Sequence, residues 1–474
     1  MQTNLNDMHG KPDEFTRREC LRVGSLGASG LGFTQLISAK LASGQELPSA
    51  TSGIGSGAAF GKAKSVILFW LNGGPAQHET WDPKPNAPLE VRGPFQPIAT
   101  RTNGLQVCEL MPRTAQLTDK IAVLRAVVTG DNAHSSSGYA MLTGVPHIPL
   151  NAESVTAKAP NLWPCADSIV RLFRASKNGL PASVVLPEHV WNDGNFPWPG
   201  QDAGFLGRKF DPWLIPCDPN SPQFKIPDLS FPDDVTASRF DHRRRLLEQV
   251  NGRIDETLSA SPVRRYSDEA RQANGLLGGS AARQAFDLSQ EPDALRDRYG
   301  RSRYSQSVLL ARRLVESGVS VVRINWTRIA GKPNQGGWDT HSAHSQSCKE
   351  FLMPMMDQAY SALLEDLNER GLLDQTLVVW LGEFGRTPKF NANAGRDHWG
   401  SVFSIALAGA GVRGGIVHGS SDRHAAFPVE GRVEPHDVLA TIYHSLGLRP
   451  ETEIHDALGS PQPISRGSII HSIF

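Results

Sequence analysis

Three short segments of this 474-residue chain gather residue types that bind metal ions. They read GGWDTHSAH at 336–344, GEFGRTP at 382–388 and GRDHWG at 395–400. A carboxylate close to an imidazole, joined by a distant histidine, forms a donor set that suits zinc, manganese or iron. One histidine alone is more often a hydrogen-bonded loop residue, so the prediction depends on the grouping. The candidate ligands are Asp339, His341, His344, Glu383, Asp397 and His398.

The elements before these segments predict that they meet. Apolar runs of strand length at 319–326 and 376–381 precede the first two segments, and a third run at 65–71 ends at Asn72. Helical patterns at 351–370 and 435–446 alternate with these runs and with a further strand at 402–407. Such alternation predicts an α/β fold, a doubly wound and mostly parallel central sheet flanked by helices. Ligands of such sheets bind at the carboxyl ends of strands, so we expect Asn72 to join the site.

The alternation of strand and helix patterns weakens between about residues 150 and 315. Aromatic and proline clusters at 191–199 and 210–219 precede charged helical stretches at 240–256 and 304–316. We interpret this part as a cap inserted over the core. Its aromatic residues either stack on sugar rings or pack beneath long loops, and these residues are Trp191, Trp198, Phe205 and Trp213.

The first 44 residues have the form of a twin-arginine export signal. Arg17 and Arg18 precede an uncharged run at 23–39, which is too short and too glycine-rich for a membrane-spanning helix. The alternative is an amphipathic first helix of the fold. We expect a periplasmic or secreted protein with no integral membrane segment in the mature chain, a linker at 45–62 and a body at 63–474.

Charge and cysteine content restrict the partners. Lys plus Arg and Asp plus Glu both number 48, so no global positive field favours nucleic acid. Five cysteines at 20, 108, 165, 217 and 348 form no C-x-x-C pair, which argues against a cysteine zinc site. We expect mostly buried thiols, although an oxidising periplasm would permit a disulfide between Cys165 and Cys217.

Several motifs together resemble a known bacterial family. LNGGPAQHETWDPKP, HSSSGYAMLTG, GGWDTH, GEFGRTP and GRDHWG, after the twin-arginine start, are similar to the domain-of-unknown-function 1501 family over nearly the whole mature chain. GLLDQTLVVWLGEFG and HDVLATIYHSLGL also resemble the alkaline phosphatase and sulfatase superfamily. The resemblance implies an alkaline phosphatase-like sheet that holds one or two divalent ions, with zinc or manganese favoured.

The superfamily pattern divides into two halves in this chain. One metal would be held by Asp339, by His341 or His344, and by His398. The positions of the other metal carry Asn72, Glu383 and Phe384, so this half has lost a carboxylate and an imidazole.

The resemblance also locates a nucleophile position. Counting back nine residues from Thr143-Gly144 reaches His134, and no cysteine has the surroundings of a formylglycine site. His134 could attack phosphorus, or it could replace the missing imidazole as a ligand while Ser135 or a metal-bound water attacks. We favour the ligand role, because neutral imidazole binds metals well. A third interpretation is that His134 only helps to cap a helix together with Ser135 to Ser137.

Three further residues have two interpretations each. Glu79 and Asp82 could supply the carboxylate that Asn72 lacks, although Asp82-Pro83 also fits the start of a turn. Arg386 could bind a substrate anion, or it could form an ion pair with Glu383 or Asp397.

The sequence therefore predicts an exported, metal-dependent hydrolase of phosphate, phosphonate or sulfate esters that is sulfatase-like but not formylglycine-dependent. Its partner would be a small-molecule or polysaccharide ester. The alternative is a non-catalytic relative that binds an envelope glycan or a partner protein. A phosphomutase-like transferase is disfavoured, because it needs a serine where His134 stands.

Overall fold

The computed structural model describes residues 59–192, 196–226 and 280–474, together with isolated positions between 227 and 279. The predicted export signal and most of the predicted linker lie outside these residues, as does most of the charged stretch at 240–256.

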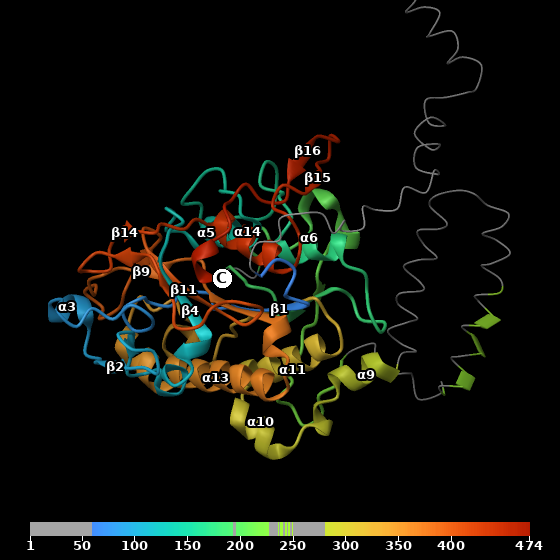
Figure 1. Ribbon diagram of the computed structural model, residues 1–474, viewed down its shortest axis with the longest axis horizontal. Coiled ribbons are helices and arrows are strands. Elements are labelled where there is room, and N and C mark those ends of the chain that lie inside the picture. Colours follow the sequence, from blue (N-terminus) through green and yellow to red (C-terminus); the bar gives the residue numbers. More distant parts are fainter. Residues whose placement is uncertain are drawn as a thin grey trace, which may run out of the picture. The chain divides into compact units, whose positions relative to one another are not determined.

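An eight-stranded sheet forms the centre of the described part of the chain (Figure 1). Its order is β12 (Val417–His418), β4 (Ile121–Val127), β11 (Phe403–Ala408), β8 (Thr376–Leu381), β1 (Ser65–Trp70), β7 (Val321–Asn325), β5 (Ser183–Leu186) and β6 (Trp213–Leu214). All neighbours pair in parallel except β11, which runs antiparallel to both β4 and β8. The predicted mostly parallel sheet is confirmed.

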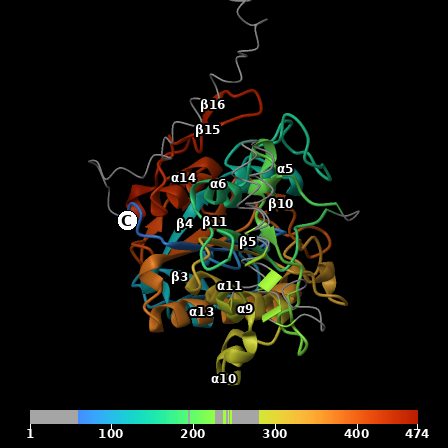
Figure 2. The same ribbon diagram turned by 90° about the vertical axis from the view of Figure 1, so that its right-hand side faces the viewer.

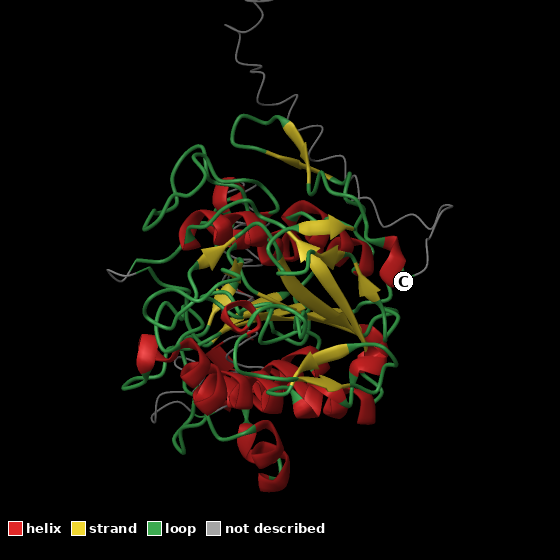
Figure 3. Ribbon diagram, turned by 90° about the vertical axis from the view of Figure 1, so that its left-hand side faces the viewer, coloured by secondary structure: helices red, strands yellow, loops and turns green. Residues whose placement is uncertain are grey.

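Helices cover both faces of this sheet (Figures 2 and 3). One layer holds α5 (His134–Thr143), α6 (Ala166–Phe173) and α14 (Pro435–Ser445). The other holds α11 (Arg303–Glu316) and α13 (Met353–Glu369), with α9 (Ser280–Phe286) and α10 (Asp293–Tyr299) beside them. Alternate residues of β1 join different cores: Phe69 packs with the α11 and α13 side, and Leu68 with the α5 and α14 side. A strand buried on both faces reads as a continuous apolar run, which is the pattern seen at 65–71.

The interpretation of residues 150–315 as a cap needs correction. This part supplies strands β5 and β6 to the central sheet, and helices α6 and α11 cover the sheet. β5 has four residues and β6 has two, so neither produces an apolar run long enough to stand out in the sequence.

Short elements complete the described chain. The remaining helices are α3 (Leu89–Arg92), α4 (Pro112–Ala115) and α12 (His344–Ser347). Four two-stranded pairs are β2 (Pro97–Ala99) with β3 (Gln106–Cys108), β9 (Gly385–Arg386) with β10 (His398–Trp399), β13 (Ser420–Ser421) with β14 (Pro428–Glu430), and β15 (Glu453–His455) with β16 (Pro461–Pro463).

The four described cysteines are free thiols, three of them buried, so Cys165 and Cys217 form no disulfide. Among the described residues, no helix combines the length and the apolar character that crossing a bilayer requires.

One edge of the sheet collects the segments singled out in the sequence. The parallel strands β1, β4, β7 and β8 all end at this edge, and antiparallel β11 begins there, directly after β10. The loop after β4 leads into the first turn of α5. Segments far apart along the chain are thereby brought to one place.

Candidate metal centre

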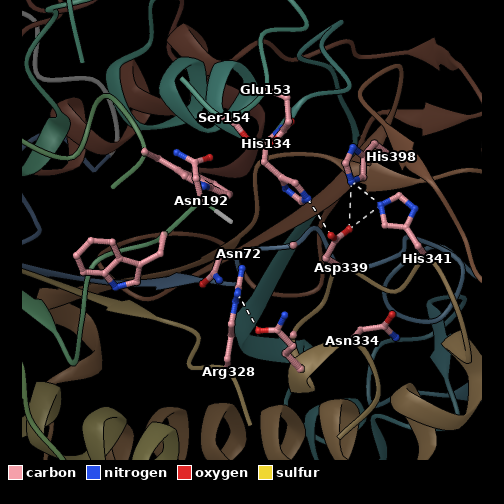
Figure 4. A pocket seen from close by; sticks show the side chains of 15 residues that line it. Asn72, His134, Glu153, Ser154, Asn192, Arg328, Asn334, Asp339, His341 and His398 are labelled. Atoms are coloured by element: carbon pink, nitrogen blue, oxygen red, sulfur yellow. Dashed lines mark hydrogen bonds and ion pairs between the residues drawn. The ribbon is translucent and has the colours of Figure 1, made fainter. Parts of the chain in front are cut away.

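Three imidazoles surround the carboxylate of Asp339 at this edge (Figure 4). The Nε2 atoms of His341 and His398 lie 3.0 and 3.1 Å from its Oδ1. The Nε2 atom of His134 lies 3.3 Å from its Oδ2. Ligand atoms of His134, Asp339 and His398 all lie within 4.8 Å of one another, which is close enough for one cation to reach each of them.

The opposite nitrogen of each ring is held by an acceptor. His134 Nδ1 lies 2.7 Å from Glu383 Oε1, and His341 Nδ1 lies 2.7 Å from Asp397 Oδ1. His398 Nδ1 lies 2.7 Å from the carbonyl oxygen of Asn132. When each Nδ1–H donates to its acceptor, Nε2 is the nitrogen of each ring that faces Asp339. Metal-binding histidines are oriented by this kind of outer contact.

Glu383 supports His134 from behind. Its side chain is fully buried, and Oε1 also accepts the backbone N–H of Gly73 at 2.8 Å. Gly73 has φ +110°, and a Cβ there would lie 2.4 Å from the backbone nitrogen of Asp339, so only glycine fits. Among the described residues, the buried Glu383 Oε2 and Asn72 Oδ1 atoms have no hydrogen-bond partner. Unpaired buried oxygens beside a histidine cluster fit a site that takes up a cation.

Arg386 fixes the geometry of the cluster. Its buried guanidinium donates to Asp339 Oδ1 at 2.7 Å, to the carbonyl of Gly74 at 3.1 Å, to that of Arg396 at 3.0 Å, and to that of Gly73. With these contacts made, Arg386 orients Asp339 and the loop after β1. It pairs with neither Glu383 nor Asp397 among the ion pairs of the described chain, and it does not line the cavity beside the cluster.

The titration behaviour of the cluster follows from these contacts. Burial alone would lower the pKa of His134, but hydrogen bonds to Asp339 and Glu383 outweigh it and raise the pKa to about 9. Burial would raise the pKa of Asp339, yet Arg386 and the imidazoles hold it far below its usual range. The hydrogen bond to Asp339 raises the pKa of His341, whereas burial lowers the pKa of His398. Without a metal, His134 therefore keeps a proton at neutral pH, and a cation would displace it.

The structure places His344 elsewhere. Ala343 adopts the left-handed conformation at φ +46°, and α12 begins at His344, which turns this side chain into the core. His344 Nε2 lies 3.1 Å from Glu79 Oε2, and Glu79 Oε1 accepts from Arg396 at 2.7 Å. Burial lowers the pKa of His344. Of the two histidines in GGWDTHSAH, only His341 belongs to the cluster.

The other proposed carboxylates are also used elsewhere. Asp82 pairs with Lys84 at 3.0 Å and with Arg125 at 3.5 Å, and its second oxygen accepts from Ser421. Glu79 belongs to the buried network of His344 and Arg396. Neither residue lines the cavity beside the cluster.

The hydroxyl of Ser135 does not line that cavity either. It is buried and donates to Asn192 Oδ1 at 2.6 Å. The N-cap position of α5 is Ala133, without a side-chain cap hydrogen bond, so His134 is the first helical residue and does not act as a cap. The neighbouring Ser137 donates to the carbonyl of Glu383 at 2.6 Å and ties α5 to the end of β8.

A cavity of about 430 Å³ opens beside the cluster. Its walls include Asn72, His134, Glu153, Ser154, Trp191, Asn192, Trp198, Arg328, Asn334, Gln335, Asp339, His341 and His398. Trp198 stacks on His134 with ring centres 5.4 Å apart, and Phe384 stacks on His398 at 4.6 Å. Phe384 is buried, does not line the cavity and packs an apolar ring behind His398.

Only two of the four aromatic residues considered in the sequence line the cavity. Trp191 and Trp198 line it, whereas Phe205 packs edge-on against Trp163 and Trp213 packs against Phe286. Glu153, Arg328 and Asn132 were not predicted from the sequence. The loops that carry Glu153 and Arg328 have an ordinary composition, so no sequence pattern marks these two residues. Asn132 contributes only its backbone carbonyl, and the neighbouring motif HSSSG is the one sequence feature that could have pointed to it.

Comparisons with solved structures return weak matches. A sulfatase from Pseudoalteromonas sp. is 14% identical and gives a TM-score of 0.39, covering 81% of this chain and 68% of that one. A phosphonate monoester hydrolase from Silicibacter pomeroyi is 12% identical and gives 0.37, covering 86% and 76%. TM-scores of this size do not support assigning an activity to this chain. No curated protein matches the sequence. A family model matches residues 63–474, almost all of the described chain, and the chain therefore belongs to the family described as protein of unknown function, DUF1501.

Proposed function

We propose that this protein is a metal-dependent hydrolase of phosphate, phosphonate or sulfate esters. The observation that carries the proposal is the convergence of three imidazole Nε2 atoms on Asp339, each ring being fixed through Nδ1. A purely structural cluster has no need to direct three imidazole Nε2 atoms at one carboxylate. The motif resemblance to phosphatases and sulfatases agrees with this choice of reaction.

His134, Asp339 and His398 would hold the cation, and His341 lies beside them with its Nε2 2.9 Å from that of His398. Zinc and manganese both suit imidazole and carboxylate donors. A bound divalent ion would polarise the ester and make water nucleophilic near neutral pH. Arg386 and Glu383 keep Asp339 and His134 in place, while Trp198 and Phe384 limit the access of bulk water to the buried sides of the rings.

Water is the nucleophile that this geometry favours. Ser135 is buried and bonded to Asn192, so its hydroxyl cannot reach a substrate in the cavity. Both nitrogens of His134 already have partners, Glu383 and Asp339, which suits a ligand better than an attacking group. His134 then supplies the imidazole that is missing at position 384, where this chain carries phenylalanine.

A binding protein without catalysis is the second candidate. It is favoured by Phe384 and Asn72, which leave the second half of the superfamily metal site without an imidazole and a carboxylate. Such a protein would bind an envelope glycan or partner protein at the same cavity.

Metal analysis combined with turnover tests the proposal. Purified protein should contain about one zinc or manganese ion per chain by elemental analysis and should hydrolyse aryl phosphate, phosphonate or sulfate esters. Asp339→Asn should lose both metal and activity, and the exposed Asp293→Asn should lose neither. Metal-free protein that still turns over esters would contradict the proposal. Bound metal without turnover of any ester would favour the binding protein.

We also propose that the protein is exported by the twin-arginine route to the periplasm or beyond. The support comes from Arg17, Arg18 and the uncharged glycine-rich run after them, all outside the described residues. Replacing both arginines with lysine should leave the precursor in the cytoplasm of the host, as judged by fractionation. Unchanged delivery of the double variant would contradict this route.

A further inference from the structure

Residues 151–155 form a loop that is fastened to the first turn of α5, beside the metal cluster. The backbone N–H of Ala152 donates to Ser136 Oγ at 3.0 Å, and that of Asn151 to Asp131 Oδ2 at 3.1 Å. The backbone N–H of Val155 also donates to Ser135 Oγ at 3.4 Å, so two of the three consecutive buried serines of HSSSG hold this loop. These contacts also place the side chain of Glu153 at the wall of the cavity.

The carboxylate of Glu153 occupies the start of α5. Its Oε2 accepts the backbone N–H of His134 at 2.6 Å. Free N–H groups at a helix N-terminus attract anions, and the helix dipole adds to the attraction. Here a carboxylate of the protein already uses that position, so a substrate anion meets a negative charge where it would otherwise find a donor.

The other charged groups around the cavity leave almost no net positive charge to attract an anion. Arg328 is the one arginine or lysine among the described residues that line it, and it donates to Gln335 Oε1 at 2.8 Å. With one divalent ion bound and neutral imidazoles, the ion, Arg328 and Arg386 carry four positive charges. Four carboxylates balance them, namely Asp339, Glu383, Asp397 and Glu153. A dianion therefore has no net positive field to bind to.

We infer that the site selects esters with a single negative charge over dianions of the same shape, and that Glu153 is a specificity-determining residue for this choice. The inference rests on the proposed function and narrows it. Sulfate monoesters, phosphonate monoesters and phosphodiesters are monoanions. Phosphate monoesters, with a second pKa near 6, are dianions above neutral pH.

The test compares benzenesulfonate with phenylphosphonate, which contain no ester bond to hydrolyse, have nearly the same shape and differ by about one charge at pH 8. Their dissociation constants are measured by titration calorimetry at pH 8 with zinc-loaded wild type, Glu153→Gln and Glu451→Gln. Glutamine keeps an acceptor for the His134 N–H but removes the charge. Glu451 is exposed, does not line the cavity and serves as the matched control.

We expect wild type to bind benzenesulfonate more tightly than phenylphosphonate. Coulomb energy is proportional to the charge of the ligand. If Glu153→Gln tightens benzenesulfonate binding about 3-fold, it should therefore tighten phenylphosphonate binding about 10-fold. Added salt should reduce the fold-change in binding that Glu153→Gln causes for each ligand. The Glu451→Gln values should match wild type.

Two results would overturn the inference: equal or tighter binding of the dianion by wild type, or the same change for both ligands in Glu153→Gln. Because binding is measured without turnover, a charge preference in a protein that hydrolyses no ester would remove the proposed function and leave the selection by charge standing.

Discussion

His134 is engaged at both ring nitrogens, by Glu383 on one side and Asp339 on the other. A residue in this position is expected to bind a metal and not to attack a substrate. The two roles predict different metal contents for a variant that lacks the imidazole ring of His134.

We expect His134→Ala to lower the metal content to a small fraction of the wild-type value, because one of three close donors is lost. The measurement is elemental analysis after gel filtration, with His455→Ala as a control at a distant exposed strand. Intact metal content, together with an acid-labile phosphohistidine after rapid quenching with a phosphate ester, would instead identify His134 as the nucleophile.

Individual side chains were predicted less well than the segments that carry them. His341 and His344 cannot be ranked by spacing, because the left-handed turn at Ala343 decides which ring faces the cavity. Arg386 was considered for substrate binding, but the pairing of β9 with β10 encloses it. A sequence shows that a charge follows a strand. It does not show how many backbone carbonyls surround that charge.

At the scale of elements, the strand ends were predictable. Uninterrupted apolar runs at β1, β7 and β8 mark central strands, and the parallel arrangement makes their carboxyl ends meet. Asn72, Asp339 and Glu383 accordingly lie at one edge of the sheet. The antiparallel direction of β11 could not be read, since an apolar run has the same pattern in both directions.

The buried pair Glu79 and Arg396 joins the segment after β1 to the loop before β10. Burial would raise the pKa of Glu79, but Arg396 and His344 outweigh it and hold the pKa far below its usual value. A depressed pKa stabilises the fold above the unfolded value of about 4.5. That contribution is lost as the pH falls toward the folded value.

Glu79→Gln should therefore destabilise the protein by about 3–5 kcal/mol at pH 7, because it leaves Arg396 buried without its charge partner. The difference from wild type should shrink as the pH is lowered below about 4. Urea unfolding at several pH values measures this, with the exposed Glu90→Gln as control. A difference that stays constant down to acid pH would show that the ion pair adds nothing.

At the scale of the whole molecule, the cluster draws on segments that span residues 72 to 398. Such a site exists only once β1, β4, β7 and β8 have assembled, so a ligand of the site binds the native state and not the unfolded chain.

Removing the metal should therefore lower the melting temperature. A ligand at 100 times its dissociation constant stabilises the native state by about 2.7 kcal/mol, which in a chain of this size amounts to about 3–5 °C. Scanning calorimetry before and after chelation, and again after zinc is restored, measures the shift. His134→Ala should melt at one temperature with or without zinc, and a zinc-dependent shift in that variant would place the ion elsewhere.

The stacking of Trp198 on His134 gives the cluster an optical signal. A protonated imidazole quenches the emission of an indole that lies against it, and His134 holds its proton up to about pH 9 when no metal is bound. A cation that displaces this proton should brighten Trp198. The difference in emission between wild type and Trp198→Phe would then report the occupancy of the site as a titration proceeds, without a substrate or an attached dye.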